Sequence, residues 1–295
     1  MFRRLRNFDY QEAETVDEAV GILYSCGGKA AVLAGGVGLI GDMKRGSKSP
    51  EVVVSIKKIS DLDYIAKNES DFLRIGALTS IRTAELSPII RAGYPALFDA
   101  VSQIASVQVK TMSTLVGNLC VATPASDIAP PLAALGAQLI ISGPGKTRYV
   151  PLEHFYLGVG KTVLEPGELV TEVLVPSVLP GTHSAFLKIA RTRADIAKVN
   201  VAVTIRVVDG ICQEARIVLG SVAPTVVRAK TAESLILSNR LESKVIEKAA
   251  QAAAQEVRPI TDIRSTEEYR KQMVAVLVRR ALEKCCKNSG EVNTV

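Results

Sequence analysis

The sequence has few cysteines and histidines, and they are scattered. Its five cysteines form no Cys-x-x-Cys pair and show no spacing typical of zinc or of an iron–sulfur cluster, and its two histidines are too few for a metal site of their own. We therefore predict no metal site in this chain. An odd, dispersed set of cysteines also favours reduced thiols in a cytoplasmic protein over a disulfide framework.

Long uncharged hydrophobic runs are also missing. No stretch approaches the ~20 apolar residues that a membrane-spanning helix needs. The basic start, Met1-Phe2-Arg3-Arg4, lacks the apolar segment of a secretory signal. We therefore expect no transmembrane segment and a location inside the cell.

The net charge of +6 is not matched by a nucleic-acid-binding pattern. The seven tyrosines and six phenylalanines are dispersed, and no basic stretch is interleaved with them. Basic residues do gather at 44–58, where a solvated surface or a docking face for an acidic partner explains them more simply. We expect no nucleic-acid partner.

The order of apolar residues predicts mixed strands and helices in the first part of the chain. The expected elements are a helix capped by Thr15, a strand at 30–33, a glycine turn and a strand at 52–56. The two strands and the residues between them form a compact β-α-β unit. Thr79 is the expected cap of a helix at 80–86, and a further helix covers about 95–106. Residues 110–127 are small and polar without a clear period, which predicts irregular structure.

The second part of the chain contains a strong hairpin signal. Residues 199–207 alternate with the period of a half-buried strand, and Asp209-Gly210 leads to a returning strand at 215–219. Helices are expected at about 230–238, 242–256 and 265–286. We predict an α+β fold divided at 1–60, 61–180 and 181–295, the last part being a smaller domain with an antiparallel sheet and helices.

The first candidate binding segment is Ala34-Gly35-Gly36-Val37-Gly38-Leu39. Glycines allow a sharp turn between strand and helix and a close approach of backbone to a ligand. Successive N–H groups at such a turn can hold an anion, helped by the positive end of the helix that follows. A tight turn without a ligand explains the same residues.

The second candidate runs from Ser113-Thr114-Leu115-Val116-Gly117-Asn118 to Thr123-Pro124-Ala125-Ser126-Asp127. Its hydroxyls and amide suit phosphate oxygens, and its single carboxylate suits the hydroxyls of a sugar or polyol. The alternative is a long capped loop in which Asp127 is the N-cap of the next helix.

These two segments, in this order, resemble the FAD-binding medium subunits of the molybdenum hydroxylases, the family of xanthine dehydrogenase and aerobic carbon monoxide dehydrogenase. The family's first loop reads roughly Ala-Gly-Gly-x-[Ser/Thr/Asp]-Leu. Its second reads Gly-Thr-Ile-Gly-Gly-Asn, followed by Asp-Pro-Ala-[Ser/Ala]-Asp. Segments 166–172 and 186–199 are similar to that family as well. The resemblance implies a two-part FAD-binding domain of the PCMH type over residues 1–180, its subdomains being 1–60 and 61–180.

The resemblance also implies roles for individual residues. Backbone N–H groups of the first loop hold the FAD pyrophosphate, the second loop closes over the phosphates, and Asp127 meets the ribityl chain or a nearby ring atom. Lys188 is expected near the edge of the isoalloxazine ring, and the alternative is an exposed lysine on a strand. Leu169 is expected to place an apolar side chain near the flavin ring, and Leu164 is the alternative residue for this role. The implied FAD-binding residues are Ala34, Gly35, Gly36, Val37, Gly38, Leu39, Thr114, Gly117, Asn118, Thr123, Ser126, Asp127, Leu169 and Lys188.

Some positions depart from the family pattern. Val37 and Gly38 replace polar side chains of the relatives, and Ser113 and Val116 replace glycines. A β-branched residue at 116 is disfavoured if that position needs a positive φ. If FAD binds, backbone amides are expected to carry more of the contact than side chains.

The function implied by the resemblance is electron transfer within a heterotrimer. FAD receives electrons from the [2Fe–2S] clusters of a small partner subunit, after substrate oxidation at a large molybdopterin-binding subunit, and passes them to NAD, a quinone or oxygen. One alternative is a docking subunit that has lost its flavin. Another is a free-standing PCMH-type flavin oxidase, which is disfavoured because no histidine or cysteine is expected near the loops to tether FAD covalently.

Overall fold

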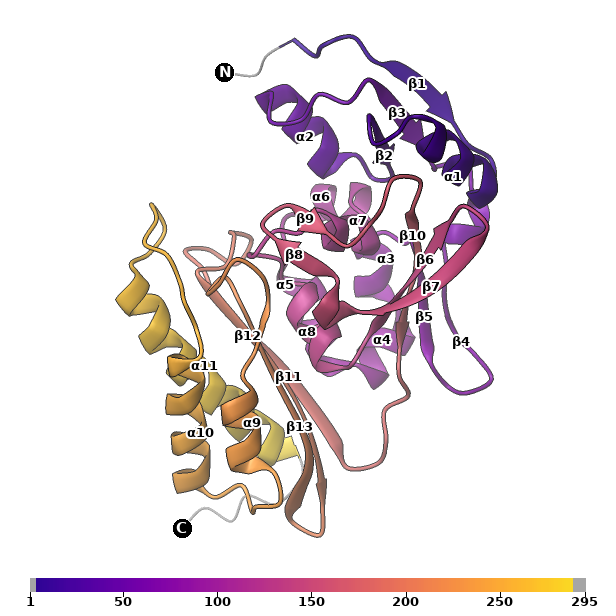
Figure 1. Ribbon diagram of the computed structural model, residues 1–295. Helices are drawn as coiled ribbons and strands as arrows, with labels where there is room; N and C mark the ends of the chain where they lie inside the picture. The colour runs from indigo at the N-terminus through magenta and orange to yellow at the C-terminus, as the bar shows by residue number, and fades with distance from the viewer. Residues whose placement is uncertain (1–3, 289–295) are drawn as a thin grey trace.

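The computed structural model describes residues 4–288 and places sheets of three, five and four strands in succession along the chain, together with one two-stranded sheet (Figure 1). The first sheet is parallel, with the order β1-β3-β2. Its strands are β1 (Asp9–Glu12), β2 (Ala30–Leu33) and β3 (Val52–Ser55), connected by helices α1 (Val16–Ser25) and α2 (Val37–Arg45). The predicted β-α-β unit is confirmed by the parallel pairing of β2 with β3.

Helix α1 begins where its capping residues predict. The Thr15 side chain accepts a hydrogen bond from the Glu18 N–H at 3.1 Å. The Glu18 carboxylate in turn accepts from the Glu14 N–H at 2.8 Å, so side chains satisfy two donors near the helix start. Ala19, Val20 and Leu23 are buried on one face, which fixes the helix against the sheet.

The second sheet is antiparallel and has the strand order β4-β5-β10-β6-β7. The strands are β4 (Ile65–Lys67), β5 (Leu73–Gly76), β6 (Gln138–Gly143), β7 (Lys146–Pro151) and β10 (Leu169–Val175), and the hairpin β8 (Tyr156–Gly158) and β9 (Lys161–Thr162) lies beside them. Between β5 and β6 the chain forms α3 (Ile81–Leu86), α4 (Pro88–Gly93), α5 (Pro95–Gln103), α6 (Val107–Met112), α7 (Leu115–Cys120) and α8 (Ala129–Ala134).

Two local predictions in this region are wrong. Ser80, not Thr79, caps α3, because the Thr79 hydroxyl donates to the Tyr64 carbonyl at 2.8 Å instead. The segment predicted to be irregular contains α7 and the second half of α6. Both are short helices of six residues, too short to leave a periodic pattern, and the hydroxyls of Ser106 and Thr114 cap them.

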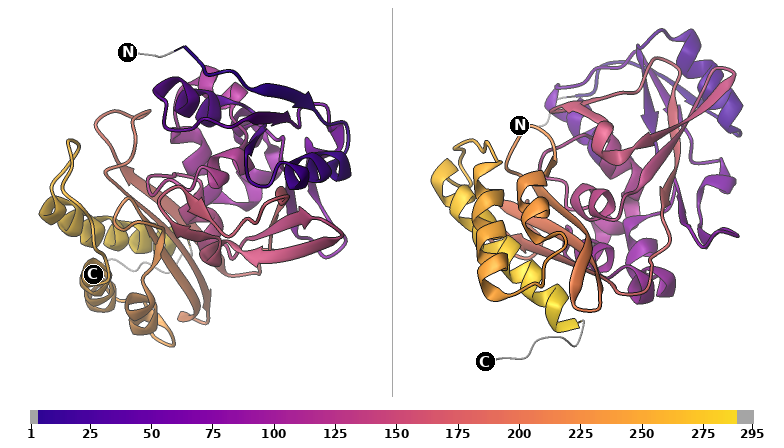
Figure 2. Two further views of the ribbon diagram at one scale, coloured as in Figure 1. Left: turned by 45° about the horizontal axis from the view of Figure 1, so that its top comes forward. Right: turned by 60° about the horizontal axis from the view of Figure 1, so that its bottom comes forward.

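The third sheet is antiparallel and is covered by helices on both faces (Figures 1 and 2). Its strands are β11 (Thr182–Ile189), β12 (Val199–Val208), β13 (Ile211–Gly220) and β14 (Val227–Arg228). Helices α9 (Lys230–Ile236) and α11 (Glu267–Asn288) cover one face, with α10 (Ser243–Gln255) packed on both of them, while α5 and α8 cover the other face.

The predicted hairpin is confirmed, but the predicted half-burial of its first strand is wrong. Asp209 and Gly210 have φ of 52° and 76°, as a two-residue turn between twisted strands requires. Residues 199–203 are all buried, however, because α5 and α8 cover the side that alternation assigned to solvent.

Two hydrophobic cores hold the fold together. One runs through both the first and the second sheet, and the other lies between β11–β13 and α9–α11. The predicted α+β class is confirmed, whereas the division at residues 60 and 180 stays a prediction. Among residues 4–288, no helix has the length and apolarity to span a bilayer.

Candidate cofactor-binding site

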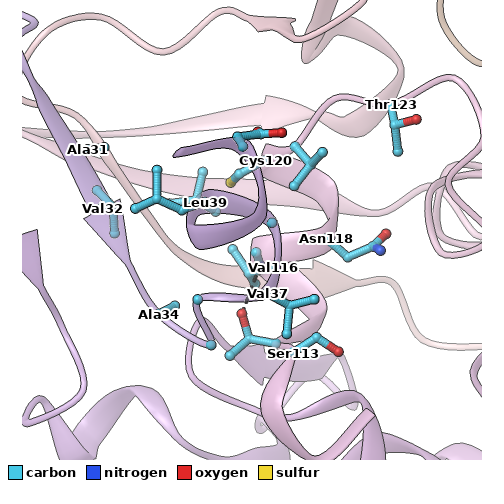
Figure 3. Close-up of a pocket in the computed structure, with 18 of the residues that line it drawn as sticks. Ala31, Val32, Ala34, Val37, Leu39, Ser113, Val116, Asn118, Cys120 and Thr123 are labelled. Atoms are coloured by element: carbon cyan, nitrogen blue, oxygen red, sulfur yellow. Dashed lines mark hydrogen bonds between the residues drawn. The ribbon is translucent and has the colours of Figure 1, made fainter. Parts of the chain in front are cut away.

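A cleft of about 830 Å³ lies between the two glycine-containing segments (Figure 3). Strand β2 and the start of α2 form one wall, and α7 with the segment after it forms the other. The turn before β10 and residues 48–51, 104–105 and 194–196 add to the lining. Segments far apart in the sequence therefore meet around one cavity, which has the size of a typical cofactor site.

The first glycine segment presents the open start of a helix to this cleft. Gly36 has φ of 81° and is the N-cap of α2, with no side chain to bond the first turn. The first helical hydrogen bond runs from the Ile40 N–H to the Gly36 carbonyl at 2.9 Å. The N–H groups of Val37, Gly38 and Leu39 have no backbone acceptor within residues 4–288. Backbone N–H groups at a helix start, together with the helix dipole, are suited to hold an anion.

Gly35 brings the two segments into direct contact. A Cβ atom at this position would lie 2.0 Å from the Met112 carbonyl oxygen and 2.9 Å from the Ser113 Cα. Only glycine permits this approach of one backbone to another. The width of the cleft at this point is therefore set by the contact between Gly35 and the end of α6.

The second segment is held by its own hydrogen bonds. Thr114 accepts from the Gly117 N–H at 3.0 Å, so its hydroxyl closes the first turn of α7. Asn118 accepts from the Ser126 hydroxyl at 2.8 Å, and its Nδ2 has no acceptor within the described part of the chain. Asn118 therefore keeps a donor for a ligand, and so does Thr114, because its hydroxyl only accepts in the contact with Gly117.

Ser126, rather than Asp127, supports the start of α8. The Ser126 hydroxyl accepts from the N–H groups of Ile128 and Ala129 at 3.2 and 3.1 Å. The alternative in which Asp127 caps this helix is therefore wrong, because the Asp127 side chain points to the third sheet.

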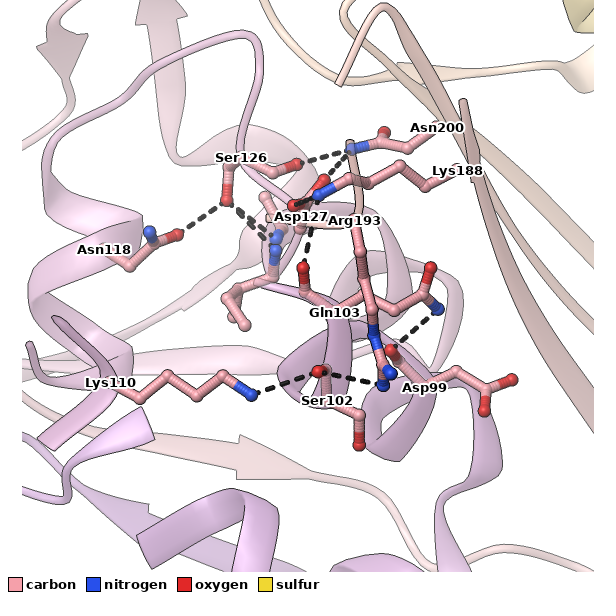
Figure 4. Close-up of polar contacts among 12 residues, drawn as sticks. Asp99, Ser102, Gln103, Lys110, Asn118, Ser126, Asp127, Lys188, Arg193 and Asn200 are labelled. Atoms are coloured by element: carbon pink, nitrogen blue, oxygen red, sulfur yellow. Dashed lines mark hydrogen bonds and ion pairs between the residues drawn. The ribbon is translucent and has the colours of Figure 1, made fainter. Parts of the chain in front are cut away.

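Asp127 belongs to a buried polar cluster at the back of the cleft (Figure 4). Its carboxylate lies 2.7 Å from the Lys188 Nζ and accepts from the Asn200 Nδ2 at 2.8 Å. The side chains of Lys188 and Asp127 are only 2% and 5% exposed. Burial raises the pKa of Asp127, and the Lys188 ammonium and the Asn200 amide oppose that rise.

The departures from the family pattern do not strain this site. Val116 lies inside α7 and is not among the described residues with positive φ, so a β-branched side chain is tolerated there. Ser113 has φ of −81°, an ordinary extended conformation. At Gly38 a Cβ would meet the Val121 side chain at 3.0 Å, so the small residue relieves crowding.

All but one of the residues expected at the site line the cleft. Lys188 is the exception, because its ammonium lies behind Asp127. The sequence analysis missed Ala31 and Val32 of β2 and residues 104–105 and 194–196. Only Ala105 carries a conformational signal, a φ of 47° that is rare for alanine.

Comparison with known proteins places this geometry in a family. Residues 6–178 match the FAD-binding domain in molybdopterin dehydrogenase, and residues 184–285 match the CO dehydrogenase flavoprotein C-terminal domain. The chain belongs to this flavoprotein family. The predicted two-part FAD-binding fold with a smaller C-terminal domain is thereby confirmed, and so is its place among oxidoreductase subunits that bind FAD.

Relatives of this flavoprotein match it over nearly its whole length. The carbon monoxide dehydrogenase medium chain of Hydrogenophaga pseudoflava is 34% identical over 275 residues, covering 93% of this chain and 96% of the relative. The glyceraldehyde dehydrogenase medium chain of Sulfolobus acidocaldarius is 30% identical over 276 residues, covering 94% and 97%. A solved structure of carbon monoxide dehydrogenase from H. pseudoflava superposes with a TM-score of 0.93 at 33% identity, covering 97% and 99%.

The flavoprotein cleft also contains a cysteine that the sequence analysis did not place there. Cys120, at the end of α7, lines the cleft, so the expectation of no cysteine near the loops is wrong. Burial raises the pKa of its thiol to about 12. At neutral pH almost none of it is thiolate, which makes it a poor nucleophile for a covalent flavin tether.

We expect Cys120 of this flavoprotein to resist alkylation at pH 7 and to react faster as the pH rises, about tenfold per unit while the thiolate is the minor form. Mass spectrometry after iodoacetamide treatment measures this at each cysteine. Cys26, which is also partly exposed but does not line the cleft, serves as the internal control. Labelling of Cys120 as fast as Cys26 at pH 7 would contradict the assignment of a protonated thiol.

Proposed function

We propose that this chain is the electron-transferring FAD subunit of a molybdenum hydroxylase complex, in which it binds FAD non-covalently across the two glycine segments. The observation that carries the proposal is the contact between Gly35 and the end of α6, which places the unpaired N–H groups of α2 at the wall of the cleft. Backbone N–H groups at a helix start suit a pyrophosphate.

Different residues around the cleft would contact different parts of FAD. The N–H groups of residues 35–39 would bind the pyrophosphate, and the Asn118 amide would close over it from the opposite wall. Asp127 would accept from a hydroxyl of the ribityl chain, and Leu169 would give an apolar contact. Lys188 would act through Asp127, because it keeps that carboxylate charged and oriented. When bound, FAD supplies the redox chemistry by accepting electrons and passing them on.

The partners follow from the relatives. Those relatives are named as medium chains, and the solved structure is of a carbon monoxide dehydrogenase that lacks the Mo-pyranopterin moiety of its molybdenum cofactor. We propose a large molybdopterin-binding subunit and a small [2Fe–2S] subunit that delivers electrons, with NAD, a quinone or oxygen as the external acceptor. The odd number and the scattered positions of the five cysteines support a cytoplasmic location.

The proposal is tested by the visible spectrum of the purified chain and of its complex. Bound flavin should be released by acid, and its absorbance should bleach only when partner subunits and an oxidisable substrate are present. Bleaching of the isolated chain by a substrate would indicate a free-standing oxidase. A complex that turns over substrate while containing no flavin would overturn the proposal in favour of a docking subunit.

A further inference from the structure

Lys110 is a buried cation that lies outside the cleft. It belongs to α6, and its residue surface is only 4% exposed. Its Nζ lies 2.6 Å from Glu85 Oε1 of α3. It also donates to the Ser102 carbonyl of α5 at 3.0 Å (Figure 4). Glu85 also pairs with Arg82 at 2.6 Å. Burying a charge is costly, so such a group is retained where its fixed geometry matters.

Few other interactions hold helix α6 in position. It has six residues, and isolated helices of that length do not form in water. Val107 and Met112 point outward and are each 54% exposed. The Ser106 cap holds the first turn, and Lys110 joins the helix to both α3 and α5. The Ser102 carbonyl lies in the last turn of α5, where the helix dipole favours a cation.

The end of α6 is also where the two glycine segments meet. The Met112 carbonyl packs against Gly35. Directly after it, the Ser113 carbonyl accepts from the Ile81 N–H at 2.9 Å, and the Leu115 N–H donates to the Thr79 carbonyl at 3.0 Å. The start of α3 therefore holds the second segment through its backbone, while Glu85 near the end of α3 holds α6 through Lys110.

We infer that Lys110 is a positioning residue of the FAD site. By fixing α6 between α3 and α5, it sets where Met112 meets Gly35 and thereby the spacing of the two walls that bind the pyrophosphate. The inference rests on the proposed function for the identity of the ligand, but the spacing itself is a property of the flavin-free chain.

A merely structural ion pair would lower stability without a selective effect on the cleft. Arg228 gives a control of this kind, because it pairs with the buried Glu233 through bonds of 2.9 and 3.0 Å and with Glu153 at 3.4 Å, and none of these three residues lines the cleft. Lys110→Met and Arg228→Met each remove the cation and leave a carboxylate in place. Lys110→Arg keeps the charge and tests for rescue.

The experiment uses the full chain. We expect Lys110→Met to weaken FAD binding by about tenfold or more in a fluorescence titration, and to speed amide exchange at residues 107–117 before FAD is added. Arg228→Met should change neither the FAD affinity nor the amide exchange at residues 107–117, even if it lowers the melting temperature as much as Lys110→Met does. Lys110→Arg should recover most of the affinity. Should Lys110→Met fail to fold, Glu85→Gln, which keeps an acceptor for Lys110, should show the same selective pattern.

The outcomes separate the two proposals. Unchanged exchange at 107–117 in Lys110→Met, or an equal loss of FAD affinity in Arg228→Met, would overturn the role of Lys110. A wild-type chain and complex that bind no FAD would overturn the proposed function. In that case the exchange measurement still decides whether Lys110 fixes the wall of the cleft.

Discussion

Replacing Gly35 by alanine is expected to weaken FAD binding by on the order of 100-fold. The new Cβ would lie 2.0 Å from the Met112 carbonyl oxygen, whereas real Cβ contacts are essentially never shorter than 3.0 Å. The two walls of the cleft must therefore separate by about 1 Å. Misplacement of groups by that distance costs about two orders of magnitude in rate at a catalytic site, and we expect a loss of similar size for hydrogen bonds to the pyrophosphate. Gly35 itself has no positive φ, so the effect is steric rather than conformational.

The same substitution should cost about 1–3 kcal/mol of stability, as overpacking of a tight contact does. Gly21→Ala is the matched control, since a Cβ there meets no atom within 4 Å. Gly21 lies in the exposed middle of α1, where alanine should stabilise by about 0.5–1 kcal/mol. FAD titration and urea unfolding of both variants measure the two effects. A Gly35→Ala chain with wild-type FAD affinity would show that the contact with Met112 does not set the cleft.

How much of this site can be read from the sequence depends on the range of the interactions. The two glycine segments are local signals, and their order along the chain indicates one ligand. Thr15 with Glu18 and Asp209 with Gly210 are local as well, and both form the structures that their side chains and turn preferences dictate. Local signals therefore predict this helix start and this turn correctly, although Ser80 rather than Thr79 caps α3.

The elements that the sequence does not predict are formed by contacts between residues far apart along the chain. Strand β1 was not predicted because its four residues are all exposed, and it forms only through its parallel pairing with β3. Helix α6 is held by Lys110 through Glu85 and Ser102, and a buried lysine in a polar segment cannot be distinguished in sequence from a solvated one. Lys188 presents the same ambiguity, since its partner Asp127 lies 61 residues away along the chain.

Lys188→Met should be the most destabilising of the substitutions considered for this chain, by about 3–5 kcal/mol at neutral pH. It removes the cation 2.7 Å from Asp127 and leaves a buried carboxylate with the Asn200 amide as its remaining side-chain partner. Lys29→Met is the control, because Lys29 and Glu51 are 65% and 66% exposed. Loss of such a surface pair should cost about 0–1 kcal/mol.

The cost of Lys188→Met should depend on pH in a defined direction. Burial raises the pKa of Asp127, and in the variant the Lys188 ammonium no longer opposes that rise. A carboxyl with a raised folded-state pKa binds its proton more tightly when folded, so stability is lost as the pH rises above the unfolded value of about 3.9. Urea unfolding should therefore show a larger deficit at pH 7 than at pH 4. A deficit independent of pH would indicate lost packing rather than an unpaired charge.

A double-mutant cycle with FAD titration separates the two roles that Lys188 can have at this site. If Lys188 acts only through Asp127, then Lys188→Met and Asp127→Asn weaken FAD binding by similar factors, and the double variant binds no more weakly than either. The double variant should also regain part of the stability, because it leaves no unpaired charge in the core. A direct contact of the ammonium with the flavin predicts the opposite, namely independent losses that add. Since the cleft is lined by Asp127 and not by Lys188, we expect the losses not to add.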